Sequence, residues 1–509
     1  MSLSRYRRPL FAVLVVLALG GLYAAAAGHP ASAASSFDHA GQEGRAAVST
    51  AMRVCPAPGS AGVTSASVAL AAMPGTASAG SAVMTRLVPG GSQATGQEVA
   101  TATTPGVLQI TAIKAAPRLT TAELAGQPGS SAEVTTQLGR GGVLVTASGA
   151  MAQGLEVEQT GPGGLVTAQC GAPGTNFWFV GPGQATTAAI ELYLMNTGNQ
   201  AADAQVSVLT DVTKGPPLLG NADNGISVPP HSMVVQSLGT LLQSSKVMAL
   251  DVSTSVGQVV AAVRESRSAD DDGGWLAPTQ APAKHLVIPG LPGTSGTPHL
   301  YIAVPGTTPA QLKITAVTTR GSYQPTGGTG LDLLGGSAVS IALPSLGGVP
   351  GAIAISSNVP VTAAMLEPGG PAGAPGAVAV SSGPVMEQGV LADNPARSAG
   401  STDLVLSAPT AAATVRIVTA TSTTSSIGQA GEIVHIQAGF SVLVPVKAPA
   451  GTRATQLAVI VTPLGASGPV YASRVISTGG AVQSIMPVPS SLTWIPLPGV
   501  QNSLSAILH

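Results

Sequence analysis

A block of two short strands joined by a tight turn recurs along this chain at nearly constant spacing. The block at residues 143–155 aligns without a gap with the block at residues 353–365. Blocks ending at residues 263 and 474 fit the same frame, so the equivalent positions 151, 259, 361 and 470 are 108, 102 and 109 residues apart. Self-similarity at a fixed period is typical of repeat proteins. The sequence therefore predicts four copies of one unit of about 105 residues.

Short strands, rather than helices, fill each expected unit. Runs of five to eight residues rich in Val, Ile, Thr and Ala alternate with turns, which use many of the 64 Gly and 41 Pro residues of this 509-residue chain. Each unit holds about seven such runs, a number typical of an immunoglobulin-like β-sandwich. We therefore predict an all-β fold of tandem immunoglobulin-like β-sandwich units. The alternative is a β-propeller-like closed repeat in which each unit forms two blades.

The repeat and the local composition together divide the chain into six predicted segments. Residues 1–33 are expected to be a signal peptide or membrane anchor, and residues 34–50 a small, polar linker. The four β units are then expected at residues 51–173, 174–283, 284–386 and 387–509.

The first segment has the pattern of an export signal. Arg5, Arg7 and Arg8 precede an uncharged, mainly apolar run at residues 9–27, and Ala-Ser-Ala follows at residues 31–33. This pattern predicts an N-terminal helix that is either cleaved after Ala33 or kept as a single-pass anchor. Both alternatives place the bulk of the chain outside the cytoplasm, because the arginines before the apolar run stay on the cytoplasmic side. The protein is thus expected to be secreted or membrane-anchored.

The two cysteines agree with this location. Cys55 and Cys170 form an even count in an exported chain, which predicts one disulfide; two buried free thiols are the alternative. Both residues begin a Cys-x-Ala-Pro-Gly pattern, at the heads of the first and second expected units. The bridge would therefore clamp the first unit at both of its ends.

Two segments also resemble a known family. They are Cys-Gly-Ala-Pro-Gly-Thr-Asn-Phe-Trp-Phe at residues 170–179 and Gly-Pro-Val-Tyr-Ala-Ser-Arg at residues 468–474, with further matches at residues 55–58 and 273–278. The chain resembles exported actinobacterial proteins that are defined only as a domain of unknown function. The resemblance covers nearly everything after residue 50 and implies an exported chain of β repeats. It implies no catalytic residue or ligand, because the family has no established activity.

Charge and motifs exclude several functions. The chain has 21 basic and 22 acidic residues, only 8% in total, so it lacks the basic surface that nucleic-acid binding requires. It has no nucleophile elbow, phosphate-binding loop, dinucleotide fingerprint or zinc-protease motif, and no two of its seven histidines have metal-ligand spacing. We therefore predict no catalytic residue, no metal site and no cofactor.

One acidic run is a weak ion-site candidate. Asp270, Asp271 and Asp272 are consecutive, and carboxylates in a loop are ligands that Ca²⁺ prefers. The spacing departs from the alternating pattern of a calcium loop, because neighbouring side chains in an extended segment point apart. A solvated turn between two units is the favoured interpretation.

Aromatic residues give the candidate interaction surface. Phe177, Trp178, Phe179 and Tyr193 lie close together in a chain with only 3% aromatic residues, and Trp275 joins them as a further candidate. In a half-exposed strand, Trp178 would point away from its two neighbours and stack on a sugar or anchor a partner. Alternatively, these rings fill the cleft where the first and second units meet.

These observations predict a non-enzymatic cell-envelope protein that acts as a scaffold or an adhesion module. The alternative is a glycan-binding accessory to envelope polysaccharide assembly, and an unfamiliar hydrolase is the third hypothesis. The expected partners are envelope proteins or polysaccharides, and the membrane itself if the N-terminal segment is not cleaved.

Overall fold

A computed structural model describes most of the repeat region. The described residues are 45–57, 67–73, 79–87, 97–102, 109–114, 141–161, 167–212, 218–219, 225–266, 274–346, 348–369, 376–395, 400–420, 431–448 and 456–497. The predicted signal or anchor at residues 1–33 lies outside them. No helix in this described part has the length and apolar character needed to span a membrane.

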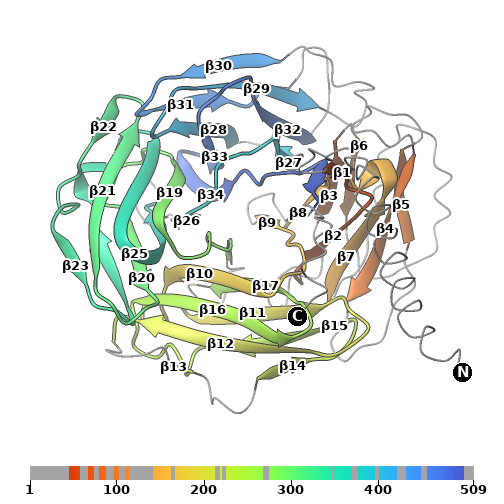
Figure 1. Cartoon of the computed structure of the whole chain (residues 1–509), viewed down its shortest axis with the longest axis horizontal. Coiled ribbons are helices and arrows are strands. Elements are labelled where there is room, and N and C mark those ends of the chain that lie inside the picture. The colour runs from red at the N-terminus through yellow and green to blue at the C-terminus, as the bar shows by residue number, and fades with distance from the viewer. Residues whose placement is uncertain are drawn as a thin grey trace, which may run out of the picture. The chain divides into compact units, whose positions relative to one another are not determined.

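The described residues form β-strands and two short 3₁₀ helices, η1 (Gly149–Met151) and η3 (Pro344–Leu346), which confirms the all-β prediction (Figure 1). The first repeat contains β2 (Thr50–Cys55), β3 (Ser67–Ala72), β4 (Gly80–Leu87), β5 (Gln97–Ala102), β6 (Gln109–Lys114), β7 (Gly142–Ser148), β8 (Glu156–Thr160) and β9 (Thr167–Gln169). The second contains β10 (Asn176–Pro182), β11 (Ala189–Asn196), β12 (Ala202–Thr210), β13 (Leu218–Leu219), β14 (Ile226–Val228), β15 (Ser232–Ser237), β16 (Val247–Val256), β17 (Val260–Ser266) and β18 (Gly274–Leu276).

The third repeat contains β19 (Ala283–Leu291), β20 (His299–Val304), β21 (Ala310–Thr318), β22 (Gly321–Tyr323), β23 (Leu331–Leu333), β24 (Ser337–Ala342), β25 (Gly351–Glu367) and β26 (Ala377–Val380). The fourth contains β27 (Gly389–Pro395), β28 (Gly400–Ala408), β29 (Ala413–Ala420), β30 (Glu432–Ile436), β31 (Phe440–Pro445), β32 (Gln456–Pro463), β33 (Tyr471–Thr478) and β34 (Ala481–Pro487). Two further strands, β1 (Arg45–Ala47) and β35 (Trp494–Pro496), pair with each other. Residues 45–47, expected to be linker, thus form a strand.

One strand order occurs in all four repeats. The first repeat has the sheets β2-β7-β4-β5 and β6-β3-β8-β9, and the fourth repeat has the equivalent sheets β27-β32-β29-β30 and β31-β28-β33-β34. The second repeat follows the same order. Each repeat is therefore a pair of interleaved antiparallel sheets, in which the chain crosses several times from one sheet to the other. In the third repeat the 17-residue β25 serves both sheets, pairing with β19 and β21 along its first part and with β20 and β26 along its second.

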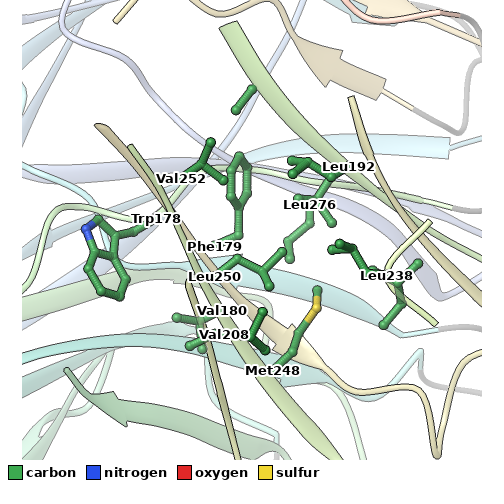
Figure 2. Packing of buried hydrophobic residues seen from close by; sticks show 14 of the residues in the cluster. Trp178, Phe179, Val180, Leu192, Val208, Leu238, Met248, Leu250, Val252 and Leu276 are labelled. Carbon is green, nitrogen blue, oxygen red and sulfur yellow. The ribbon is translucent and has the colours of Figure 1, made fainter. Parts of the chain in front are cut away.

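An apolar core fills the space between the two sheets of a repeat. In the second repeat, Phe179 of β10 and Leu250 of β16 belong to one cluster with Leu192 of β11 and Leu276 of β18 (Figure 2). All four side chains are at most 3% exposed. Burial of such side chains stabilises the fold by about 1.5–3 kcal/mol each relative to exposed positions.

The sheets also pack between repeats. The cluster of the second repeat includes Tyr301 and Ala303 of the third, and the cluster of the third repeat includes Val405 and Val475 of the fourth. A separate cluster joins Leu144 of the first repeat to Met195 of the second. The remaining contact is between the first and fourth repeats, through Ala69, Ala71, Ala392, Ala458 and Ile460. Each repeat therefore packs against two others, and the series of repeat contacts is closed because the fourth repeat packs against the first.

Some strands are buried on both faces of their sheet. All positions from Val68 to Ala72 of β3 are buried, because one face packs inside the first repeat and the other on the fourth. Small alanines supply much of the second face, which lets the sheets approach closely. The contacts group residues 47–493 into one compact unit. The four domain boundaries stay a prediction.

Candidate functional site

The last strands of the four repeats, β9, β18, β26 and β34, surround a pocket of about 640 Å³ within residues 47–493. Its wall includes Arg53, Glu156, Thr167, Gln169 and Cys170 of the first repeat, Phe177, Glu265 and Trp275 of the second, Ala377 and Val378 of the third, and Gln483, Ser484 and Met486 of the fourth. The volume lies in the range of small-molecule binding sites, about 300–1,000 Å³. Because all four repeats contribute, the pocket exists only in the assembled chain.

One wall of the pocket is aromatic. Trp275 of β18 contacts Tyr193 of β11 in an edge-on arrangement, with ring centroids 5.1 Å apart and an angle of 67° between the rings. Tyr193 is 4% exposed, and its hydroxyl donates to Glu191 over 3.0 Å. Burial, together with the Glu191 charge, raises the pKa of Tyr193 to about 12. Tyr193 thus stays neutral and supports the Trp275 ring from behind.

A second aromatic side chain, Phe177, lines the pocket beside a glycine. A Cβ atom at Gly174 would lie 3.0 Å from Cζ of the Phe177 ring. The backbone of Gly174 is also fixed, because its N–H donates to Val259 over 2.9 Å. Glycine at this position therefore leaves room for the ring to lie against the backbone.

Charged groups on the wall are held by neighbours. Arg53 donates from Nη2 and Nε to the two oxygens of Glu156, over 3.1 and 3.3 Å. Ser491 donates to the same carboxylate over 3.0 Å. Glu156 is 2% exposed, so it is accommodated by this paired guanidinium rather than by water.

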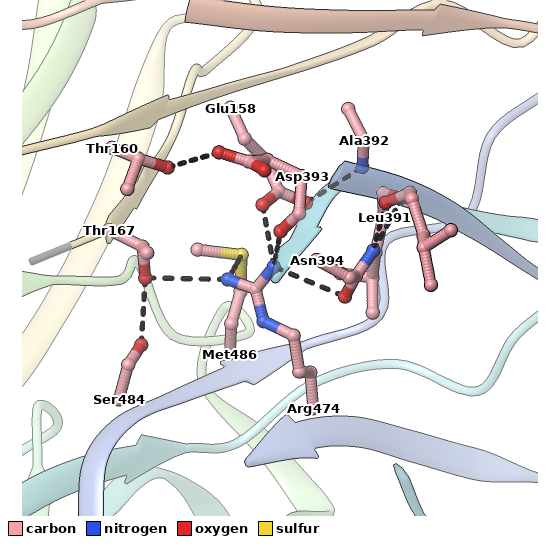
Figure 3. A network of polar contacts seen from close by, with 11 residues as sticks. Glu158, Thr160, Thr167, Leu391, Ala392, Asp393, Asn394, Arg474, Ser484 and Met486 are labelled. Atoms are coloured by element: carbon pink, nitrogen blue, oxygen red, sulfur yellow. Dashed lines mark hydrogen bonds and ion pairs between the residues drawn. The ribbon is translucent and has the colours of Figure 1, made fainter. Parts of the chain in front are cut away.

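Behind the wall lies a buried polar network around Arg474 (Figure 3). Its Nη1 donates to Glu158 over 2.7 Å and to the carbonyl oxygen of Asp393, while its Nη2 donates to Thr167 over 3.3 Å. The Thr167 hydroxyl is 2.8 Å from that of Ser484, and both residues line the pocket. The network thereby joins the first repeat to the fourth and holds the wall between them.

Both carboxylates of this network lie near the Arg474 guanidinium, but only that of Glu158 accepts a hydrogen bond from it. Asp393 accepts a hydrogen bond from Thr160 over 2.5 Å, and Glu158 accepts one from the backbone of Ala392 over 2.9 Å. Burial raises the pKa of both acids, although Arg474 acts in the opposite direction. The ion pair with Arg474 therefore offsets only part of the cost of burying these two acids.

Comparison with known proteins identifies a family over most of this structure. The model of a family of unknown function (DUF5719) matches residues 124–447, more than half of the chain. The chain belongs to this family. No curated protein matches it. The DUF5719 match includes Phe177, Trp275 and Glu156, whereas Arg53 and Arg474 lie beyond its two ends. The aromatic wall thus lies in the DUF5719 segment, and the residues that complete the pocket flank that segment.

The structure confirms the disulfide and locates it at this site. Cys55 and Cys170 are bonded, each is at most 1% exposed, and Cys170 lines the pocket. The bond joins the end of β2 to the residue after β9, so it ties the first strand of the repeat to its last. The alternative of two free thiols is thereby wrong.

The aromatic candidates separate into two groups. Phe177 and Trp275 line the pocket, whereas Phe179 is fully buried and Tyr193 lies behind Trp275. Trp178 is only 8% exposed and belongs to the cluster that includes Tyr301 of the third repeat. An exposed ring at Trp178 is therefore a wrong expectation. The ring fills a contact between repeats, but this is the contact between the second and third repeats, not the first and second.

The ion-binding prediction for the acidic run is not tested by the described structure. Asp270, Asp271 and Asp272 lie outside the described residues. Within the described ranges, no group of three or more His, Cys, Asp or Glu residues is placed to hold a metal ion.

Sequence reasoning missed the groups that complete the site. In the sequence, Arg474 is only the last residue of a resembling segment, and no motif marks Glu156 or Glu158. The available signal was the alternation Glu-Val-Glu in a strand whose five residues are all buried, because buried carboxylates require partners. The partners lie between 103 and 335 residues away and have no local signature.

Proposed function

We propose that this protein is a non-enzymatic, extracytoplasmic scaffold of the cell envelope that presents a binding pocket. The closed series of repeat contacts carries this proposal. Sheets buried on both faces, the Cys55–Cys170 bond and the Arg474 network make a rigid support, as a preorganised binding site requires. These contacts also support the propeller-like closed repeat over separate immunoglobulin-like sandwiches.

The chemistry of the wall supports binding rather than catalysis. Among the described residues that line the pocket there is no histidine or lysine, and the one cysteine is in the disulfide. The Glu156 carboxylate is held by Arg53 and Ser491. A nucleophile with a neighbouring base, which acyl transfer requires, is not formed by these lining residues.

The proposed location outside the cytoplasm has two supports. The first is the charged and apolar pattern of residues 1–33, and the second is the disulfide, which persists in oxidising compartments. Fractionation of cells, followed by N-terminal sequencing, tests this proposal. A mature chain beginning at Ala34, or an intact chain in the membrane fraction, supports it; an intact chain in the cytoplasm contradicts it.

A second candidate function is favoured by one observation. Phe177 and Trp275 both line the pocket, and aromatic faces are suited to the apolar faces of sugar rings. This observation supports a glycan-binding accessory to envelope polysaccharide assembly.

One sedimentation experiment separates these functions. Purified chain is incubated with isolated envelopes that are untreated, protease-treated or oxidised with periodate. Loss of binding after protease supports a scaffold for an envelope protein, and loss after periodate supports a glycan accessory. Release of soluble fragments from the envelope would contradict both and support the hydrolase.

A further inference from the structure

We propose that the pocket between the last strands of the four repeats binds a short, neutral oligosaccharide, with Trp275 as the stacking surface. This inference deepens the glycan-binding candidate by naming the site and the charge class of the ligand. It concerns one cavity, built from residues of all four repeats.

The first step is the shape of the pocket. At about 640 Å³ it accepts a ligand the size of a di- or trisaccharide, and it is too small for a folded protein surface. The strands β9, β18, β26 and β34 all contribute to the walls, together with residues that adjoin them. A site on such elements is largely preformed, so little ordering opposes binding.

The second step is the fixed aromatic ring. Trp275 is half-buried, and Tyr193 contacts it edge-on at 5.1 Å. The hydrogen bond from Tyr193 to Glu191 in turn fixes the supporting ring. The exposed part of Trp275, together with Phe177, therefore presents apolar surface to the cavity without loss of side-chain freedom on binding.

The third step is charge. The wall contains one guanidinium, Arg53, and two carboxylates, Glu156 and Glu265. Arg53 is already engaged by Glu156, so it is not available as a bidentate partner for a ligand phosphate or carboxylate. Glu156 is held in turn by Arg53 and Ser491, and Glu265 also has an interaction partner within the protein, so the described wall residues offer no unpaired charge to a ligand of either sign.

The fourth step is the neutral polar set. Gln169 and Gln483 also line the pocket and are half-buried. Amide side chains both donate and accept, as the hydroxyl groups of a sugar do. Apolar rings and neutral amides, on a wall without an available cation, together match an uncharged, hydroxyl-rich ligand.

The test uses trisaccharides of one size and three charges. Chitotriose, maltotriose and mannotriose are the neutral probes, trigalacturonate is the anionic probe, and the glucosamine trimer is the cationic probe. Binding to the full extracytoplasmic chain is measured by calorimetry and tryptophan fluorescence up to about 10 mM. We expect a neutral probe to bind more tightly than both charged probes.

Matched variants locate the site. Trp275→Ala is expected to weaken binding of the neutral probe about tenfold or more, Trp275→Phe less, and Tyr323→Ala not at all, because Tyr323 is an exposed aromatic outside the pocket. The thermal midpoint of each variant shows whether it is folded. If Trp275→Ala unfolds, Gln483→Ala serves instead.

Three outcomes overturn the proposal: no neutral probe binds, a charged probe binds more tightly, or the folded pocket variants bind as well as the wild type. The sedimentation experiment distinguishes this failure from failure of the proposed function. If the Trp275→Ala variant still binds envelopes and periodate still abolishes that binding, the glycan-binding function is supported, and only the proposed site is contradicted.

Discussion

The guanidinium of Arg474 lies 2.7 Å from the carboxylate of Glu158, across 316 residues of chain. This pair joins β33 of the fourth repeat to β8 of the first, and both side chains are almost completely buried. It adds a directional contact to the alanine-rich packing between the same repeats. The pair lies directly behind Thr167 and Ser484 of the pocket wall, so closure of the repeats and formation of the pocket depend on the same residues.

Removing this cation should destabilise the protein strongly. Arg474→Ala leaves Glu158 and Asp393 buried without their guanidinium, and loss of one partner from a buried ion pair costs about 3–5 kcal/mol. We expect a lower midpoint in urea unfolding. Lys313→Ala, which removes an exposed cation from β21, is the control and should leave the midpoint nearly unchanged.

The triple variant Arg474→Met, Glu158→Gln, Asp393→Asn should recover part of the lost stability. It also removes the two carboxylate charges that the single variant leaves buried without a partner. If Arg474→Ala has the stability of the wild type, the network does not hold the first and fourth repeats together.

A second buried acid should make stability depend on pH. Burial raises the pKa of Glu367 to about 8, and its Oε1 has no hydrogen-bond partner in the described structure. In the unfolded chain a glutamate titrates near 4.3, so between about pH 4.3 and 8 the folded state binds more protons than the unfolded state. Stability contributed by Glu367 is therefore present at low pH and lost as the pH rises through this window, by at most about 1.4 kcal/mol per pH unit.

Thermal midpoints of the wild type and of Glu367→Gln, measured from pH 5 to pH 9, test this prediction. The variant should be the more stable protein near pH 8 and should show a smaller decline. Some decline should remain, because burial also raises the pKa of Glu158 and Asp393. Glu432→Gln, at an exposed position of β30, should follow the wild type. Parallel curves for Glu367→Gln and wild type would contradict the prediction.

The three tryptophans allow a test of burial. Trp178 is 8% exposed between the second and third repeats, so Trp178→Ala should cost about 3–5 kcal/mol through loss of packing. Trp275→Ala should cost less, because its ring is only half-buried. Urea unfolding midpoints compare the stabilities of the two variants. Acrylamide quenching of fluorescence in single-tryptophan chains compares the solvent exposure of the two rings. A Trp178 that is quenched as readily as Trp275 would mean that it is not in the interior.

The disulfide should contribute to stability through the unfolded state. It closes a loop with a sequence separation of 115 residues, and removal of a native disulfide typically costs about 2–5 kcal/mol. The double variant Cys55→Ser, Cys170→Ser should therefore unfold at lower urea than the oxidised wild type and match the reduced wild type. Because Cys170 lines the pocket, the variant should also bind the neutral trisaccharide more weakly. An unchanged urea midpoint would show that the bond is dispensable.

Local signals predicted the elements better than their contacts. The strand at Asn176–Pro182 follows from an aromatic run, and the turn-linked strands β16 and β17 follow from runs rich in valine. The Cys55–Cys170 pair follows from an even cysteine count. The possible exposure of Trp178 is contradicted, because alternation along a strand shows which residues share a face, but not what covers that face. Here the outer face is covered by the third repeat rather than by water.

The sequence alone determined an all-β chain of repeated units with a disulfide, because spacing, turn residues and cysteine count are local or periodic properties. Only the tertiary structure decided that both faces of the sheets are buried, that the fourth repeat packs on the first, and that Phe177, Trp275 and Arg53 share one pocket. These relationships join residues hundreds of positions apart. They arise from the packing of whole sheets. A short segment of sequence does not indicate which distant side chain will pair with a buried charge or cover an apolar face.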